Sequence, residues 1–403
     1  MFLVKTYRIR GQGNHDDLRC RERQMSGTVV DGQTEPVTGQ PALTLYGSNI
    51  SYFTGKMENY FRIRGIPYHF ESMQFPSMER QLKREIGVSQ MPAVQLADGR
   101  WLTDTTKMIE WFESEFSDNA LMPSDPVQAF VAHLIEDWAD EWWWRPAMHY
   151  RWHYTEGARF ASWHLATELM GSVPLPVWLK GLLLRRRQRR GYTVGDGLTG
   201  QNIPAVEASV KRLFAQLQGI FSVRPYLLGS RPSLADIGLS GPFFRHFALD
   251  PVPLEILRQT APAVLEWVGR LWNSRPEDLR GEWCSTLPDD LLPLLSDIGA
   301  EYLPYLSANA QAVNRGHKRF DVQVNGIEYK KARYSQYRVW CLEQLRMRLL
   351  QLPEDTRKTT QDLLEAQGCW SALWQPQVLP LLPNQEIDLP FRATTKMIGV
   401  NEA

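Results

Sequence analysis

Cysteine is scarce in this sequence of 403 residues, and its spacing excludes several chemistries. No two cysteines form a CxxC pair or a metal-ligand spacing, so we expect no metal site and no dithiol redox centre. None lies between positions 20 and 284, which excludes a thiolate nucleophile from that long stretch. Sparse, widely spaced thiols fit a reducing compartment, and we expect a cytoplasmic protein. The four are Cys20, Cys284, Cys341 and Cys369.

Long apolar runs and an excess of charge are also missing. No run approaches the roughly 20 apolar residues that span a bilayer, so no membrane span is expected. Lys and Arg number 45 and are balanced by 45 Asp and Glu, so nothing global attracts nucleic acid. Residues 1–41 lack periodicity and an apolar core, which predicts a disordered segment rather than a secretory signal. Met25 is an alternative start within it.

Alternating strand and helix signals fill the stretch from Ala42 to Phe116. Residues 43–46 favour a strand, and residues 52–64 repeat their apolar side chains at mostly helical spacing. Ser51 stands where a side-chain oxygen caps the first turn of that helix. A hairpin is predicted near 93–102, followed by a helix over 105–116.

Three segments resemble the glutathione S-transferase family. The segments are LYGSNISYFTGKMENYFRIRGIPY, SQMPAVQLADGRWLTDTTKMIEWFE and, at 224–239, RPYLLGSRPSLADIGL. The resemblance implies an α/β thioredoxin-like N-terminal domain over 42–118 and an all-α glutathione-transferase C-terminal domain over 126–275. In the last segment, Ser233 and Asp236 are better explained as a capping box than as functional groups.

Residues 276–403 extend beyond this resemblance and predict a mainly helical C-terminal extension. Amphipathic helices are expected near 287–303, 335–350 and 355–367, and a hairpin near 319–332 with Asn325-Gly326 as its turn. The Pro-rich tail from Gln375 is expected to be extended. The extension could cover the pocket, enlarge a dimer interface or bind a partner.

The resemblance also implies a glutathione site, with glutathione as co-substrate. The backbone of Met91, before a cis Pro92, would pair with the cysteinyl segment of glutathione like an added strand. Asp104 and Thr105 would hold the γ-glutamyl end at a helix start. The family has Glu-Ser at these two positions, so the carboxylate here reaches one methylene less.

Ser51 is the candidate catalytic residue, because its hydroxyl would donate to the thiol sulfur and stabilise a thiolate. The competing interpretation is a plain N-cap, and the two roles are compatible. Tyr46, at the end of the first strand, is the alternative, since some branches of the family use a tyrosine there. Tyr52 is a weaker rival.

An aromatic helix region, interrupted near Pro146, would supply the electrophile pocket. Its candidates are Trp138 and Trp142, together with Tyr52 from the first helix; the alternative is that the tryptophans pack the domain interface. His149 and His153 share a face there, but lack a third metal ligand. The basic run at 182–192 is interpreted as a solvated helix end favoured by the helix dipole.

These expectations predict a glutathione transferase that conjugates the glutathione thiolate to a small hydrophobic electrophile, an ether or a halide among the options. The alternative is a binding or scaffold protein with the same fold and little turnover, which Asp-Thr at 104–105 and the long extension favour. A homodimer is expected, in which the first domain of one subunit meets the helical domain of the other.

Overall fold

The computed structural model describes residues 43–87, 89–116 and 118–374. The predicted disorder of residues 1–41, the alternative start at Met25 and the extended tail from Gln375 lie outside the described residues. The domain boundaries predicted at 118, 126 and 275 stay predictions, because one hydrophobic core runs from Leu43 to Leu373.

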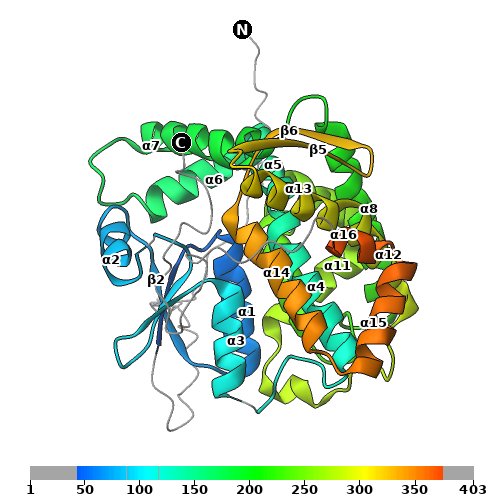
Figure 1. Ribbon diagram of the computed structural model, residues 1–403. Helices are drawn as coiled ribbons and strands as arrows, with labels where there is room; N and C mark the ends of the chain where they lie inside the picture. Colours follow the sequence, from blue (N-terminus) through cyan, green and yellow to red (C-terminus); the bar gives the residue numbers. More distant parts are fainter. Residues whose placement is uncertain (1–42, 88, 117, 375–403) are drawn as a thin grey trace, which may run out of the picture. The chain divides into compact units, whose positions relative to one another are not determined.

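The N-terminal part is a four-stranded mixed sheet with helices on both faces (Figure 1). The strand order is β2-β1-β3-β4, with β1 and β2 parallel and the other pairs antiparallel. This confirms the expected thioredoxin-like arrangement. Its elements are β1 (Leu43–Gly47), α1 (Tyr52–Arg64), β2 (Tyr68–Ser72), α2 (Ser77–Glu85), β3 (Ala93–Gln95), β4 (Trp101–Thr103) and α3 (Thr105–Glu115).

Alternation along β1 explains why both faces are covered. Successive strand residues point to opposite sides of a sheet. Leu45 joins the large core together with Met57 of α1 and Met108 of α3. Tyr46 joins a separate cluster on the other face, with Leu82 of α2.

The second part consists of helices packed on that sheet domain, as expected. They are α4 (Pro126–Trp142), α5 (Trp144–His153), α6 (Thr155–Glu168), α7 (Val177–Tyr192), η1 (Val194–Asp196), α8 (Ile203–Val223), α9 (Leu234–Pro242), η2 (Phe243–Phe247), α10 (Pro251–Thr260), α11 (Pro262–Asn273) and η3 (Pro276–Arg280). The aromatic helix breaks at Trp143, three residues before Pro146, because proline fits the first turn of α5, where no N–H is needed. The capping box of Ser233 and Asp236 is confirmed.

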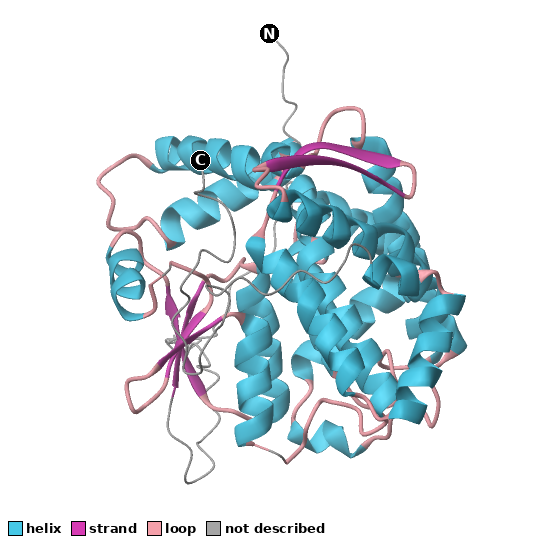
Figure 2. Cartoon of the chain, in the orientation of Figure 1, coloured by secondary structure: helices cyan, strands magenta, loops and turns pink. Residues whose placement is uncertain are grey.

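The extension is mainly helical and contains the predicted hairpin (Figure 2). Asn325 and Gly326 both have positive φ, 46° and 75°, as a tight turn between strands requires. Its elements are η4 (Asp289–Leu291), α12 (Leu292–Asp297), η5 (Ile298–Tyr302), α13 (Leu303–Asn314), β5 (Arg319–Val324), β6 (Ile327–Arg333), α14 (Gln336–Gln351), α15 (Glu354–Ala366) and α16 (Cys369–Trp374).

Helix α14 packs against both α3 and α4. Arg348 pairs with Glu110 of α3. The Nζ of Lys107, also on α3, lies 4.8 Å from the centroid of the Trp340 ring. Arg338 Nε lies 3.0 Å from a carboxylate oxygen of Glu141, next to the end of α4. The extension therefore covers these faces of α3 and α4 within the same chain.

Within the described part of the chain, no helix is long and apolar enough to cross a membrane.

Candidate active site

The register of the sheet brings three chain segments to one end. Tyr46 of β1 lies opposite Ala93 of β3, and Ala93 lies opposite Thr103 of β4. Since both neighbours of β3 run antiparallel to it, the loop after β1, the peptide before β3 and the start of α3 emerge together. These are the segments that hold Ser51, Met91-Pro92 and Asp104-Thr105.

Ser51 caps α1 and keeps a hydroxyl proton. Its Oγ accepts a hydrogen bond from the Thr54 amide at 3.4 Å, and its backbone is extended, as at an N-cap. The side chain is half-buried. Among the described residues, no hydrogen bond uses the Ser51 hydroxyl as donor. The proton is therefore available to a ligand.

Charged side chains from distant helices fix the loop before Ser51. Glu168 at the end of α6 accepts a hydrogen bond from Ser48 Oγ at 2.8 Å. Arg245 donates to the Ser48 carbonyl at 2.9 Å, and Arg151 donates to the Ile50 carbonyl at 2.6 Å. Sequence reasoning missed these three residues, because they lie at least about one hundred positions from the loop and no local pattern marks them.

Tyr46 lies on the α2 face of the sheet and is largely buried. Its hydroxyl donates to Gln95 Oε1 at 3.4 Å, and its ring stacks on Trp101 with centroids 5.3 Å apart. Burial, together with the charge of Glu71, raises the pKa of Tyr46. The Tyr46 hydroxyl thus donates its proton within the sheet domain, whereas among the described residues the Ser51 hydroxyl only accepts a hydrogen bond.

The peptide bond between Met91 and Pro92 is cis. Thr103 Oγ1 donates to the Pro92 carbonyl at 3.3 Å, which ties this turn to β4. No backbone carbonyl of the described chain pairs with the Met91 amide. An extended ligand therefore has a free backbone donor at this edge.

Asp104 has an unusual backbone and environment. Its φ of 72° and ψ of 111° are rarely adopted by a residue with a side chain, and such strain gathers at functional sites. Its carboxylate accepts from the Lys107 amide at 3.1 Å. Burial raises the pKa of Asp104 to about 6, although the hydrogen bonds from the Lys107 amide and the Tyr337 hydroxyl lower this pKa. Thr105 follows as the first residue of α3, also buried.

The extension contributes Tyr337 to this site. Tyr337 packs against the cluster that contains Tyr46, as Met91 does. Its ring stacks on Trp340, with centroids 5.2 Å apart. Sequence analysis expected Asp104 and Thr105 at a helix start but did not find this tyrosine, because residues beyond 275 lie outside the resemblance.

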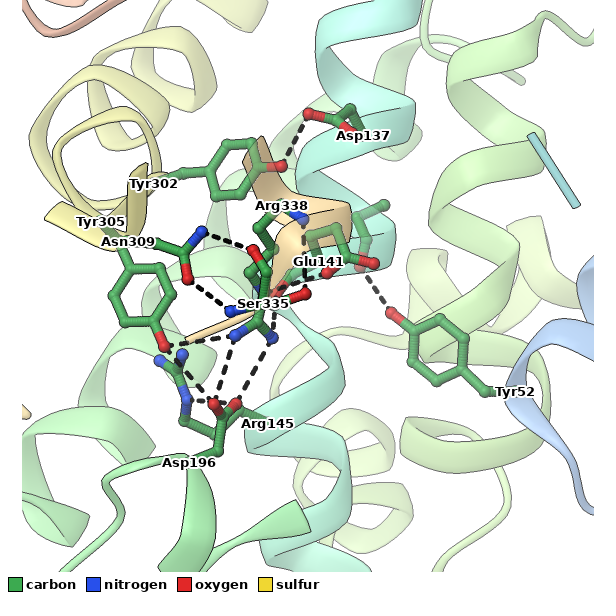
Figure 3. A network of polar contacts seen from close by, with 11 residues as sticks. Tyr52, Asp137, Glu141, Arg145, Asp196, Tyr302, Tyr305, Asn309, Ser335 and Arg338 are labelled. Atoms are coloured by element: carbon green, nitrogen blue, oxygen red, sulfur yellow. Dashed lines mark hydrogen bonds and ion pairs between the residues drawn. The ribbon is translucent and has the colours of Figure 1, made fainter. Parts of the chain in front are cut away.

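The three residues expected to form the electrophile pocket are all buried. The Tyr52 hydroxyl donates to the Ala139 carbonyl of α4 at 2.6 Å (Figure 3). Trp138 packs against Trp143, and Trp142 lies among tyrosines of the extension, with its ring centroid 5.6 Å from that of Tyr305. Their role as pocket walls stays a prediction.

Further aromatic residues pack around the Ser51 loop. Ile50 belongs to an apolar cluster with Met148 and Trp152 of α5, against which Trp144 and Tyr192 pack. Aromatic and aliphatic side chains next to the candidate serine suit an apolar co-substrate. The sequence contains several tryptophans in this region, and nothing local distinguishes those near the loop from those in the core.

A buried polar network joins the extension to the helical domain (Figure 3). Arg338 donates to Asp196 Oδ1 at 3.2 Å, and Arg145 donates to the other oxygen of Asp196 at 3.1 Å. Tyr302 donates to Asp137 Oδ2 at 2.6 Å. The contact of Arg338 with Asp196 holds α14, and therefore Tyr337, against the helical domain.

The two histidines of α5 lie close to each other, and one of them contacts a carboxylate of α8. His149 Nε2 lies 2.7 Å from Glu207 Oε1 of α8, and the rings of His149 and His153 are 4.7 Å apart. No group of three or more metal-ligating side chains occurs in residues 43–87, 89–116 and 118–374.

Comparisons with known proteins identify the family. Residues 45–120 match the model of the glutathione S-transferase N-terminal domain, and residues 199–275 match that of the C-terminal domain. No curated protein matches the chain significantly.

Solved structures with a similar fold include a beta-etherase from Sphingobium sp. strain SYK-6, at 21% identity over 59% of this chain and 98% of that chain, with a TM-score of 0.42. They also include a glutathione S-transferase from Rhodospirillum rubrum F11, at 20% identity over 61% of this chain and 96% of that chain, with a TM-score of 0.38. A third is a glutathione S-transferase from Methylobacterium radiotolerans JCM 2831 in complex with glutathione sulfonate, at 17% identity over 62% of this chain and 98% of that chain, with a TM-score of 0.36.

The two matched domain models show that the chain belongs to the glutathione S-transferase family.

Proposed function

We propose that this protein is a glutathione transferase that conjugates the glutathione thiolate to a small hydrophobic electrophile. The observation that supports this most directly is the register of the sheet. It brings Ser51, Met91-Pro92 and Asp104-Thr105 to one end of the domain. This end offers a hydroxyl donor, a free backbone amide and a carboxylate to one small thiol peptide.

Each group would take one part of glutathione. The Met91 backbone would pair with the cysteinyl segment like an added strand. Asp104 would bind the ammonium of the γ-glutamyl end, while Thr105 and the N–H groups at the start of α3 would bind its carboxylate. The apolar cluster around Ile50 would accommodate the electrophile.

Ser51 would donate its hydrogen bond to the sulfur and stabilise the thiolate. Lowering a thiol pKa by about two units requires roughly 2.7 kcal/mol. A hydrogen bond to a charged group contributes about 1.5–3 kcal/mol. The start of α1 contributes a further 0.3–1 kcal/mol, approximately. The serine and the helix start are therefore sufficient without a general base, and the thiolate then attacks an electrophilic carbon and displaces its leaving group.

The test compares Ser51→Ala with Ser51→Thr, which keeps a hydroxyl. Ser51→Ala should lose most turnover of a generic aryl halide and should raise the pKa of bound glutathione, read from thiolate absorbance. Ser51→Thr should retain both properties in large part. Asp125→Ala, which removes the cap of α4, controls for the loss of a helix cap. Full activity in Ser51→Ala and its loss in Tyr46→Phe would transfer the role to Tyr46.

A second candidate function is binding without turnover. The burial of Asp104 and Thr105, each 5% exposed, favours it, because α14 lies over the start of α3. Retention on immobilised glutathione with no turnover of any aryl halide would support this candidate.

A homodimer and a cytoplasmic location remain part of the proposal. In this chain α14 already covers faces of α3 and α4, so a second copy would have to bind elsewhere. Light scattering at micromolar concentration tests the dimer, and a monomer mass would reject it.

A further inference from the structure

The region around α7 differs from the rest of this electrically balanced chain. Between Glu168 and Asp196 the sequence contains six basic residues and no acidic one. Five of these are arginines at positions 185, 186, 187, 189 and 190, and none forms an ion pair with a carboxylate of the described chain. The helix dipole accounts for the last-turn pair, Arg189 and Arg190, but not for the others.

The same helix exposes large apolar side chains. Trp178 is 67% exposed, Leu182 is 56% exposed and Leu183 is 51% exposed. Such side chains are rarely left in contact with water side by side on a monomer without a role in binding. Leu175 and Val177, just before and at the start of α7, are also exposed.

Helical spacing places the two kinds of side chain on one face. Trp178, Leu182, Arg186 and Arg189 are separated by four, four and three positions, so they follow one line along α7. Arg186 and Arg189 are exposed, as are the two apolar residues. The outer face of α7 therefore has an apolar N-terminal half and a cationic C-terminal half.

Helix α6 widens the apolar half. A Cβ on Gly181 would lie 3.2 Å from Ser162 Cβ, so the two helices approach closely there, and Figure 1 shows them side by side. Trp163, the residue after Ser162, is 58% exposed. The two helices that meet at this contact thus carry two exposed tryptophans and two exposed leucines.

We propose that this outer face of α6 and α7 docks on an anionic lipid bilayer. Trp163, Trp178 and the leucines would enter the headgroup–acyl boundary, where tryptophan is favoured. The arginines would face lipid phosphates, which supply the missing counter-charges. The protein would lie on the membrane surface and would not span it.

Charge and chemistry favour this occupant over the others. A second copy of this face would offer apolar side chains but no acidic residue between Glu168 and Asp196, so the arginines would still lack counter-charges. Nucleic acid would pair with the arginines and could stack on tryptophan, but it has no aliphatic surface that would bury Leu182 and Leu183. A bilayer satisfies the cationic and the aliphatic groups together.

The test is co-sedimentation of the full chain with vesicles. Phosphatidylcholine vesicles with about 30% phosphatidylserine should retain the protein, pure phosphatidylcholine vesicles much less, and raising the salt to about 500 mM should release it. Arg186→Gln with Arg189→Gln should weaken binding by roughly tenfold or more and flatten the salt dependence, since each basic residue near an anionic surface contributes about fivefold. Trp178→Ser with Leu182→Ser should weaken binding while keeping the salt dependence.

Two exposed positions provide matched controls. Leu350→Ser, at 55% exposure on α14, and Arg315→Gln, at the end of α13, should bind vesicles like the unmodified protein. The proposal is overturned if the unmodified protein stays in the supernatant with anionic vesicles at low salt, or if Trp178→Ser with Leu182→Ser binds them unchanged. Binding to single-stranded RNA but not to vesicles, or a dimer mass that these substitutions abolish without vesicle binding, would also overturn it and would identify the occupant.

Discussion

The ammonium of Lys56 lies 2.5 Å from Asp140 Oδ2, although one belongs to α1 and the other to α4. Glu136 Oε1 is at the same distance on the other side, and Thr106 Oγ1 of α3 donates to it at 2.8 Å. Burial opposes the charge on Lys56, but the two carboxylates outweigh it and raise the pKa of Lys56. This group fixes α1, and with it Ser51, against the helical domain.

Lys56→Met should therefore destabilise the protein strongly. Removing one member of a buried ion pair leaves its partners desolvated and unpaired, which costs about 3–5 kcal/mol. Urea denaturation measures the loss. Lys83→Met is the control, because Lys83 pairs with Glu79 on the surface of α2, and such pairs contribute only about 0.2–1 kcal/mol. Equal losses in the two variants would contradict the role given to the buried group.

Gly65 ends α1 and lies against the beginning of the extension. Its φ is 66°, and a Cβ there would lie 2.7 Å from Pro276 Cγ. Gly99 has a similar φ of 85°, but a Cβ there would meet nothing within 4 Å. Gly99→Ala should lower the free energy of unfolding by about 1–2 kcal/mol, because alanine is disfavoured in the left-handed region. Gly65→Ala should lower it clearly more, because its Cβ would also clash with Pro276. Thermal unfolding of both variants compares the two, and a Gly99→Ala loss as large as that of Gly65→Ala would argue against the Pro276 contact.

Features that depend on neighbouring residues could be predicted from the sequence. Asn325-Gly326 form the hairpin turn, because both residues tolerate positive φ. Ser233 and Asp236 form their capping box within one turn. Ser51 caps α1 for the same local reason. The order of strands and helices around them followed from the family resemblance.

Features that depend on distant residues could not be predicted. The loop before Ser51 is fixed by Glu168, Arg151 and Arg245, and a sequence does not state which charges the fold brings together. Trp142 lies against Tyr305 and Tyr329 of the extension, and no local pattern in the sequence indicates these contacts. Hydrophobic periodicity indicates that such a side chain is buried, but not which surface covers it.

Affinity for glutathione should depend on pH through Asp104. An acid with a raised pKa binds its proton up to about pH 6, and an ammonium prefers the ionised form. Binding of S-methylglutathione, whose sulfur does not titrate, should weaken as pH falls through about 6. Asp104→Asn should weaken binding and abolish this dependence in calorimetry. Asp98→Asn, on the exposed hairpin turn of the same sheet, should keep the full profile. A pH-dependent profile in Asp104→Asn would assign the proton to another group.

Tyr337→Phe should shift that profile. The hydrogen bond from the Tyr337 hydroxyl lowers the pKa of Asp104, so its removal should raise this pKa and move the midpoint of S-methylglutathione binding to higher pH. The phenyl ring keeps its stacking on Trp340, so the position of α14 should be preserved. Tyr154→Phe is the matched control, because Tyr154 also donates to a carboxylate, Glu207 at 2.6 Å, and that pair involves none of the site residues. An unchanged midpoint in Tyr337→Phe, in a protein whose Asp104→Asn variant has lost the pH dependence, would show that the extension covers the glutathione site without acting on its carboxylate.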